Sequence, residues 1–465
     1  MFPTMPGLES FSPGPLALGE PTGPMDGGSP APGNTSQNNP RIRAGYTFLG
    51  QFIDHDLTLD VTSTLERQID VSATHNFRTP VLELDSVYGL GPSVQPYLFD
   101  TDGVRFLLPD GETDLQRNAN GRALIGDPRN DENLIISQLH LLFLKFHNKV
   151  TETAEINALT GLEKFLATQT LVRRHYQWIV LHEFLPRIVG AETVARVIAE
   201  RPFLFPSDAF MPVEFSIAAY RFGHSQTRPG YALNATAGGL LFPKDPADGD
   251  LRGFRPIAPA RAVDWTFFFG PHDPNPGGRQ DSKFIDTRLS TAMLHLPNGV
   301  VPASTPLNQR SLATRNLQRG LDARLPSGQD VAAKLLSPEV RLAEADIWTG
   351  VAGGEGPAPL WYYILKEAEV MGQGLQLAGV GAEIVARTFV AILLADPASF
   401  LNREPDWTPT LGKTEGQFTV TDLVSFTEGR DVPGERVADL PSPSGPVEAI
   451  GIIAGDTPPE VPGAG

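Results

Sequence analysis

Three short segments of this 465-residue chain place a histidine or an arginine among other polar side chains. They read GQFIDHD at residues 50–56, GDPRNDE at residues 126–132 and YRFGHS at residues 220–225. A neutral imidazole can take up and return a proton or bind a metal, and a guanidinium can stabilise a negative charge that develops during a reaction. The chain therefore carries the residue types of a proton-transfer site and of a metal ligand.

The first segment predicts a helical face with an amide beside an imidazole. On a helix, Gln51 lies one turn before His55 on the same face, while Asp54 and Asp56 flank His55 and point in different directions. A metal site made of the three consecutive residues 54–56 is disfavoured, because adjacent helical side chains diverge too far to hold one ion. The alternative interpretation is a polar helix start with a capping aspartate.

The second segment comes directly before a long apolar run. Asn130 or Asp131 could simply cap the helix that this run predicts. Arg129 is harder to explain in this way, because a buried guanidinium needs an anionic or strongly polar partner. Glu132, three residues later, can share a helical face with Arg129.

The third segment sets a glycine before a histidine. Gly223 lets a bulky group approach the backbone beside His224. A single histidine is more often structural than a ligand, so each of the three segments is weak evidence when it is taken alone.

Helices are the elements that must position these residues. Apolar patterns of helical length run from Asn133 to Ala154, from Leu162 to Val189 and from Ala378 to Leu394. The stretches between them are long and rich in proline and glycine, and strand signals are few. We expect a mainly α protein, built as a single large helical domain with long loops and few short strands.

The two ends of the chain differ from the middle in composition. Residues 1–40 are rich in Pro and Gly and predict an N-terminal arm on the surface, and residues 41–430 predict the domain itself. Residues 431–465 predict a loose Pro/Gly-rich tail, in which AIGIIAG could form a short strand.

Charge and cysteine content exclude several classes of function. The net charge is −17, with 37 basic against 54 acidic side chains, which argues against nucleic acid and against an anionic membrane surface. Because the chain has no cysteine, disulfides, thiolate-held metals and a cysteine nucleophile are excluded. No signal peptide and no apolar run of membrane-spanning length is visible, so we expect a soluble protein that is cytoplasmic or secreted without an N-terminal signal peptide. The oligomeric state cannot be read from the sequence.

Taken together and in order, the segments resemble the animal-type haem peroxidases of the peroxidase–cyclooxygenase superfamily. That family's Gly-Gln-x-x-Asp-His-Asp, Gly-Asp-x-Arg-x-x-Glu and Arg-(Tyr/Phe)-Gly-His motifs match residues 50–56, 126–132 and 221–224. Its His-Asn-(Lys/Arg) and Asn-x-Gln-Arg-Gly motifs match residues 147–149 and 316–320. The five motifs cover roughly residues 45–330, and the loops are similar to those of short bacterial members called peroxicins.

The resemblance implies haem b as cofactor and hydrogen peroxide as oxidant. On the proximal side His224 would bind the haem iron, Asn316 would accept the other ring N–H of His224, and Arg221 and Arg319 would meet the haem propionates. The implied activity is oxidation of halides, thiocyanate or small anionic or phenolic reductants through an iron-oxo haem intermediate, with a role in the response to oxidative stress.

On the distal side, the resemblance assigns three catalytic residues. His55 would move a proton between the two oxygens of peroxide, and Arg129 would stabilise the charge that develops as the O–O bond breaks. Gln51 would hydrogen-bond the distal water and a halide.

Family members also link haem through esters, and the matching carboxylates here are Asp54 and Glu132. Some members carry a methionine after that glutamate, which forms a third link through sulfur. Because this chain has Asn133 there, the sulfur link is excluded, and iodide, bromide or thiocyanate are better candidates than chloride.

The resemblance implies a calcium site as well. Calcium prefers hard oxygen ligands. The ligands would be Asp56 together with Thr79, the carbonyl of Val81, Glu83 and Asp85. The alternative is an acidic loop that is capped by its own backbone.

Three other activities remain in view. A fatty-acid dioxygenase of the same superfamily would carry a radical-bearing tyrosine three residues before the proximal histidine. Arg221 holds that position here, and Tyr220 is one residue off. A non-catalytic haem-binding or adhesion module would not need His55, Arg129 and Gln51. Catalase-like turnover of peroxide stays open.

Overall fold

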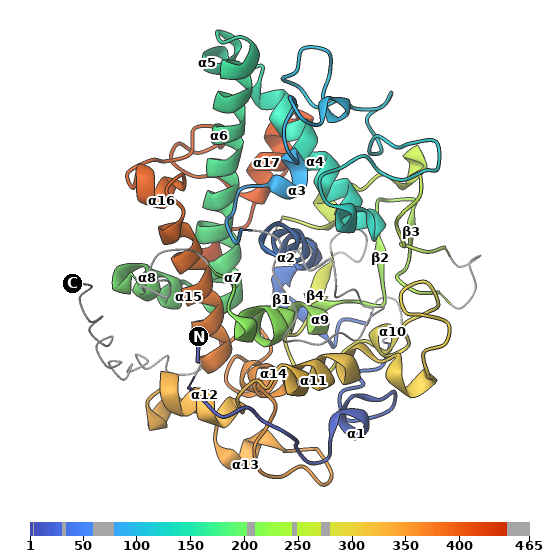
Figure 1. Cartoon of the computed structure of the whole chain (residues 1–465), viewed down its shortest axis with the longest axis vertical. Coiled ribbons are helices and arrows are strands. Elements are labelled where there is room, and N and C mark those ends of the chain that lie inside the picture. Colours follow the sequence, from blue (N-terminus) through green and yellow to red (C-terminus); the bar gives the residue numbers. More distant parts are fainter. Residues whose placement is uncertain are drawn as a thin grey trace, which may run out of the picture.

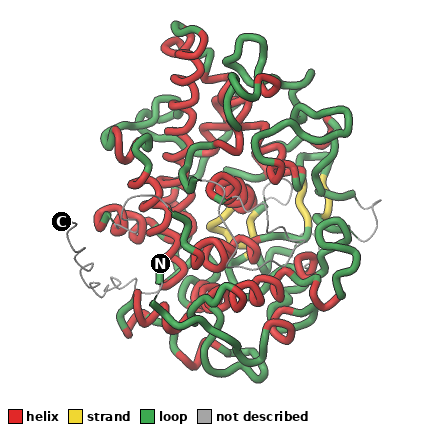
Figure 2. The backbone as a smooth tube through the Cα atoms, in the orientation of Figure 1, coloured by secondary structure: helices red, strands yellow, loops and turns green. Residues whose placement is uncertain are grey.

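The computed structural model describes residues 1–2, 4–29, 34–58, 79–201, 210–243, 249–270 and 280–443. Helices and loops make up almost all of this part of the chain, and the strands are short (Figure 2). The expectation of a mainly α protein with few short strands is confirmed. No helix in the described ranges is both long and apolar enough to cross a bilayer.

Seventeen α-helices and four strands are assigned in the described residues. The helices are α1 (Pro15–Gly19), α2 (Ala44–Leu57), α3 (Asp85–Tyr88), α4 (Leu134–Val150), α5 (Ala154–Asn157), α6 (Gly161–Ile179), α7 (Leu185–Val189), α8 (Ala191–Glu200), α9 (Gly223–Gln226), α10 (Thr291–Leu294), α11 (Leu312–Asp322), α12 (Gly328–Leu335), α13 (Glu344–Ile347), α14 (Leu360–Val370), α15 (Gly379–Ala395), α16 (Phe400–Arg403) and α17 (Val420–Glu428). The strands are β1 (Asn38–Arg43), β2 (Gly230–Ala232), β3 (Gly238–Leu240) and β4 (Asp281–Lys283), paired antiparallel as β1–β4 and β2–β3.

Helix α2 lies in the middle of the molecule, with other helices around it (Figure 1). It packs against α4 and α9 and against strand β4. Phe52 on α2 stacks on Phe143 of α4 with ring centroids 4.7 Å apart, and both rings are fully buried. This apolar contact fixes α2, which carries the first polar segment, against α4, which directly follows the second segment.

Helix α4 is buried on most of its circumference, as the apolar pattern predicts. Its N-cap is Asn133, whose side-chain oxygen accepts the N–H of Ile136 at 2.9 Å. The prediction that Asn130 or Asp131 caps this helix is wrong, because a separate 3₁₀ turn, Pro128–Asp131, precedes it. Both of those side chains are buried and point to other partners.

The second predicted helix, Leu162 to Val189, contains an irregularity that the sequence pattern does not predict. Helix α6 continues through a π-helical segment, Val180–Phe184, into α7, which ends at Gly190 with φ 86°. Pro186 has no N–H to give to the carbonyl four residues earlier, so the regular α pattern cannot run through this point. The third pattern forms α15, one residue displaced from the prediction at each end.

Both ends of the described chain are packed more closely than predicted. In the arm, Leu18 and Met25 are fully buried, and α1 packs on α11. In the tail, Val432 and Leu440 are buried. These two side chains attach residues 431–443 to the body, while AIGIIAG (449–455) lies outside the described residues. The domain boundaries themselves stay a prediction.

A buried arginine joins distant parts of the chain near β1. Arg41 donates to the carbonyls of Pro186 and Arg187 at 2.8 and 3.0 Å and to that of Pro441 at 2.7 Å. Its side chain is 3% exposed, so these three carbonyls replace the water that the guanidinium loses.

Candidate active site

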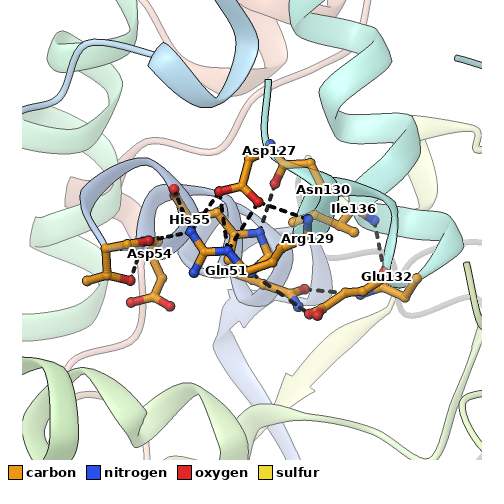
Figure 3. Close-up of polar contacts among 10 residues, drawn as sticks. Gln51, Asp54, His55, Asp127, Arg129, Asn130, Glu132 and Ile136 are labelled. Atoms are coloured by element: carbon orange, nitrogen blue, oxygen red, sulfur yellow. Dashed lines mark hydrogen bonds and ion pairs between the residues drawn. The ribbon is translucent and has the colours of Figure 1, made fainter. Parts of the chain in front are cut away.

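His55 lies in the last turn of α2 and is 5% exposed. Its Nδ1 is 2.8 Å from Oδ1 of Asn130, and Nδ2 of the same amide is 3.0 Å from Nδ1 of His140 (Figure 3 shows His55 and Asn130). An amide oxygen can only accept a hydrogen bond, so Nδ1 of His55 carries the proton and Nε2 holds the lone pair of the neutral ring. His55 is thus arranged as a base at Nε2.

Gln51 and Glu132 meet beside this nitrogen. The amide of Gln51 donates to Oε1 of Glu132, and the same carboxylate oxygen is 3.9 Å from Nε2 of His55. Asn133 donates to the carbonyl oxygen of Gln51 at 3.2 Å. The expected amide–imidazole face of α2 therefore exists, and a neighbour that the sequence reasoning did not include, Asn133, fixes the orientation of the amide.

Arg129 has the anionic partner that its burial requires. Its Nη2 donates to Asp127 at 2.8 Å, to the carbonyl of His55 at 3.0 Å and to the carbonyl of Thr58. Asp127 also caps the 3₁₀ turn by accepting the N–H of Arg129 at 2.9 Å. Burial raises the pKa of Asp127, but the hydrogen bonds and charge of Arg129 outweigh burial and bring it to about 2. The pair is therefore ionised at neutral pH.

The proximal side is built from three short helical pieces in succession. A π segment (Glu214–Ala218) and a 3₁₀ turn (Ala219–Phe222) lead into α9, which carries His224 in its first turn. The ring of His224 contacts Asn316 of α11, whose Nδ2 is 2.7 Å from Nδ1. The oxygen of that amide accepts from Arg221 at 3.0 Å. Burial, and then the charge of Arg221, lowers the pKa of His224 to about 3.

The contact between His224 and Asn316 is as predicted, but the orientation of the amide is not. We expected the amide oxygen to face the ring, whereas Arg221 holds that oxygen and the NH₂ group faces His224 instead. Binding of iron through Nε2 requires the proton on Nδ1, and so requires the oxygen of Asn316 to face Nδ1. Arg221 would then donate to another acceptor.

The backbone beside His224 faces open space. A Cβ atom placed on Gly223 would meet no heavy atom within 4 Å, although its neighbours Phe222 and Ser225 are buried. The side chains of Asp54, Glu132 and His224 are surrounded by protein and yet keep accessible surface, which is a property of residues that line an interior space. The residues present therefore fit a buried prosthetic group held by a histidine.

Two carboxyl groups stand at opposite ends of the distal group of side chains (Figure 3). Burial raises the pKa of Glu132 to about 7, against the lowering effect of Arg129. Burial also raises the pKa of Asp54, which the charges of Arg129 and Arg221 lower. Because Arg129 belongs to the distal side and Arg221 to the proximal side, the charges that act on Asp54 place it where the two sides meet.

Asp56 points away from the proton-transfer group, as the spacing predicts. It is fully buried, and its Oδ2 accepts the N–H of Leu84 at 3.1 Å, inside the loop Thr79–Asp85. The carboxylate of Glu83 in that loop lies 3.7 Å from Arg173. Across the described ranges, no group of three or more His, Asp or Glu side chains is placed to hold a metal ion. Calcium at Asp56, Thr79, Val81, Glu83 and Asp85 stays a prediction.

Two further residues have structural partners. The hydroxyl of Tyr220 donates to the carbonyl of Gly50 at 3.2 Å, and its ring stacks on Phe215 at 4.7 Å. In the His-Asn motif, Asn148 accepts the N–H of Phe106 at 2.7 Å and donates to its carbonyl at 2.9 Å. This motif therefore anchors a loop and lies outside the candidate site.

Sequence reasoning missed the roles of four residues at the site: Asp127, Asn130, Asn133 and His140. The signal for Asp127 is its place before proline, two residues ahead of an arginine. The signal for His140 is a single imidazole in the middle of an apolar helix, which needs a hydrogen-bond partner. Nothing in the sequence indicates that this partner is Asn130.

Comparisons with known proteins agree with this geometry. Residues 94–239 match the model of the animal haem peroxidase family. The chain is 26% identical over 212 residues to Peroxidase mlt-7 of Caenorhabditis elegans, which is 43% of this chain and 26% of the relative. It is 27% identical over 226 residues to a human peroxidasin homolog (44% and 14%), and 29% identical over 204 residues to human thyroid peroxidase (42% and 21%). This chain thus covers only about a quarter or less of these relatives' length.

Solved structures share the fold along most of the chain. Peroxidase A from Dictyostelium discoideum superimposes with a TM-score of 0.60 and 17% identity over 94% of each chain. A fatty acid alpha-dioxygenase from Oryza sativa gives a TM-score of 0.54 and 14% identity over 83% of this chain and 73% of its own. At these identities the likeness concerns the fold alone. Residues 94–239 thus resemble the animal haem peroxidase family, and the peroxidase relatives and the peroxidase-like fold agree with that match.

Proposed function

We propose that this protein is a haem-dependent peroxidase that reduces hydrogen peroxide and oxidises small anionic or phenolic reductants. The observation that carries the proposal is the base geometry of His55, whose Nδ1–H is taken by Asn130 while its Nε2 lies beside Gln51 and Glu132. A haem-binding module without turnover would not need a proton acceptor held in this way.

The chain offers residues for each part of the cofactor. His224 would bind iron through Nε2, Arg221 and Arg319 would pair with the propionates, and Asp54 and Glu132 would form the ester links. When bound, haem supplies an iron centre that receives oxygen from peroxide and draws electrons from a reductant. Burial raises the pKa of Glu132 to about 7, so the carboxyl group is partly protonated near neutral pH, and this suits a carboxyl group that reacts in an apolar interior.

The residues of the distal side would have different roles in the reaction with peroxide. Nε2 of His55 takes the proton from the nearer peroxide oxygen and returns it to the departing oxygen, so that water leaves. Arg129, held by Asp127, supplies fixed positive charge where negative charge develops. Gln51, oriented by Asn133, offers its remaining N–H to a water or an anion.

The test is to purify the full chain with haem supplied and to follow its Soret band after hydrogen peroxide is added and then iodide. A band that shifts with peroxide and returns with iodide is expected. Replacing His55 or Arg129 with Ala should slow the reaction with peroxide by roughly 10²–10⁴-fold with haem content unchanged. His182→Ala is the matched control, because His182 lies in the π segment away from the site. Unchanged rates in both site variants would rule out this mechanism.

The ester links have a separate test. Acidified organic solvent should fail to extract haem from enzyme that has turned over peroxide, and it should extract haem from the double variant Asp54→Asn, Glu132→Gln. Complete extraction from the unaltered enzyme would show that the two carboxyl groups are only neighbours of haem.

A further inference from the structure

A continuous chain of hydrogen bonds leads from His55 into the apolar core. Asn130 stands between two imidazoles, with its oxygen 2.8 Å from Nδ1 of His55 and its nitrogen 3.0 Å from Nδ1 of His140. Asn130 and His140 are fully buried. His140 lies on α4 against the ring of Phe52, with centroids 6.3 Å apart, so that no bulk water reaches this end of the chain of bonds.

The direction of each bond is fixed by which atoms can donate. Nδ2 of an amide only donates, so Nδ1 of His140 must hold a lone pair and its proton must sit on Nε2. Oδ1 only accepts, so Nδ1 of His55 must carry its proton. If the amide turned by 180°, both assignments would reverse together, and Nε2 of His55 would carry a proton and lose its capacity as a base.

We propose that Asn130 and His140 are positioning residues that hold His55 in its Nδ1–H tautomer and thereby present the lone pair of Nε2 to the reacting peroxide. The role in the reaction rests on the proposed peroxidase function, whereas the tautomer itself does not. The amide of Asn130 couples the two rings, because Nδ1 of His55 can donate to it only while Nδ1 of His140 accepts from it.

Because His140 lies in the interior, its protonation state stays the same at neutral pH. Burial lowers the pKa of His140 to about 3, so the ring is neutral and has a single N–H at neutral pH. The amide oxygen at Nδ1 orients the ring of His55 without placing a negative charge there.

The test reads tautomers directly from the full chain with ¹⁵N-labelled histidine, in two-bond ¹⁵N–¹H correlation spectra at pH 7 before haem is supplied. The molecule contains a standard for each form. His175 donates from Nδ1 to the carbonyl of Leu171 at 2.7 Å, and His147 donates from Nε2 to the carbonyl of Val104 at 2.9 Å. His55 should give the pattern of His175, and His140 should give the pattern of His147. His55→Gln and His140→Phe assign the two signals.

Three variants distinguish a positioning role of Asn130 and His140 from a purely structural role. In Asn130→Asp both carboxylate oxygens accept, so His140 should change to the Nδ1–H pattern while His55 keeps it. In His140→Phe the amide loses its acceptor, and a fraction of His55 should change to the Nε2–H pattern. His140→Gln supplies a carbonyl acceptor and should restore His55. The spectra of His147 and His175 should stay unchanged in all three variants, which would show that the fold is intact.

The haem-loaded variants complete the test. The rate constant for peroxide should fall by roughly 10–100-fold in His140→Phe and recover in His140→Gln, as for other partners that orient a reacting group. Two results would overturn this inference even if the enzyme reacts with peroxide. One is a spectrum that shows His55 in the Nε2–H form, and the other is a His55 tautomer that does not change in His140→Phe. His55 in the Nδ1–H form in a haem protein that ignores peroxide would contradict the proposed peroxidase function and leave the tautomer assignment standing.

Discussion

The hydrogen-bond partners of the site residues are mostly amides and backbone carbonyls. His55 meets Asn130, Gln51 is oriented by Asn133, and His224 meets Asn316. An amide orients an imidazole without favouring its charged form, whereas a carboxylate would raise its pKa. The exception is Arg129, whose partner Asp127 is ionised. At residue scale the site therefore orients its histidines with amides and pairs one arginine with an ionised carboxylate.

Asp127→Asn should slow the reaction with peroxide by roughly tenfold, since a hydrogen bond between charged groups contributes about 1.5–3 kcal/mol and Arg129 would lose its fixed orientation. Stopped-flow rates of the haem-loaded enzyme measure the effect. Asp102→Asn is the control, because Asp102 pairs with Arg105 at 2.9 Å on the surface. A rate equal to that of the unaltered enzyme would mean that Arg129 does not depend on Asp127.

Asn148→Ala should lower the free energy of unfolding by about 2 kcal/mol, because both backbone groups of Phe106 lose their partner. The control Asn157→Ala removes an exposed contact with Lys164 and should cost less than about 0.5 kcal/mol. Urea unfolding compares the two. A similar, small loss in both would show that the His-Asn motif does not anchor the loop.

At the residue scale, the sequence predicted the types and the spacing of the site residues better than it predicted their hydrogen-bond partners. Gln51 and His55 lie on one face of α2, because a helix places residues four apart on the same side. The contacts of Glu132 with these two residues were not predicted from spacing. The contacts of Asn130 with His140 and of Arg129 with the end of α2 depend on how a 3₁₀ turn packs against two helices. No local pattern encodes that packing.

At element scale, α2, α4 and α6 form the frame, and aromatic and imidazole rings fill the space between them and their neighbours. His175 on α6 is buried, with ring centroids 4.5 Å from Phe418 and 5.2 Å from Trp407. Its Nδ1 donates to the carbonyl of Leu171 at 2.7 Å. Burial lowers the pKa of His175 from 6.5 to about 4, so the helix keeps this ring neutral in mildly acidic solution.

His175 should make the protein less stable at pH 5 than at pH 7. The unfolded chain binds a proton at His175 below about pH 6.5, while the folded chain binds it only near pH 4, so this contribution is complete above pH 6.5 and lost as pH falls. Between pH 7 and 5 the loss is about 2 kcal/mol. His175→Phe should therefore show a smaller loss of stability over this interval by that amount in urea unfolding. Parallel curves for the two proteins would contradict the pKa shift.

The long helical patterns were predictable because their apolar periodicity is strong, and α4 and α15 begin and end close to the expected residues. The π segment Val180–Phe184 was not, although Pro186 marks a break. Periodicity counts apolar positions and does not reveal one extra residue in a turn. The pieces before His224 are a π segment and a 3₁₀ turn for which the sequence gives no separate signal.

At the scale of the whole molecule, segments from both ends of the described chain complete the body. Helix α1 packs on α11, which carries the proximal residue Asn316, and Ser311 at the start of α11 donates to the carbonyl of Gly19. Composition suggested loose ends, because proline and glycine are common in both. Burial of Leu18 and Val432 shows that a few apolar residues in such segments suffice to attach them.

Gly19→Ala should destabilise the protein by about 1–3 kcal/mol, the range for overpacking a filled interior. A Cβ atom at Gly19 would lie 2.5 Å from the backbone nitrogen of Thr314, which cannot move aside as a side-chain end could. Ala17→Val, on the exposed side of the same helix, should change stability by less than about 0.5 kcal/mol. Equal melting temperatures for Gly19→Ala and the unaltered protein would show that the arm does not dock on α11.

The three hydrogen bonds of Arg41 form a joint between distant parts of the chain, and this joint sets an order of events during synthesis. Its last acceptor, the carbonyl of Pro441, is 400 residues further along the chain. At about 5–20 residues per second, a ribosome takes roughly 20–80 s to reach it after Arg41 has been made. Until then the guanidinium of Arg41, which is buried in the folded protein, lacks one of its three acceptors. The nascent chain can form its helices early, but it can close this joint only when synthesis has passed residue 441.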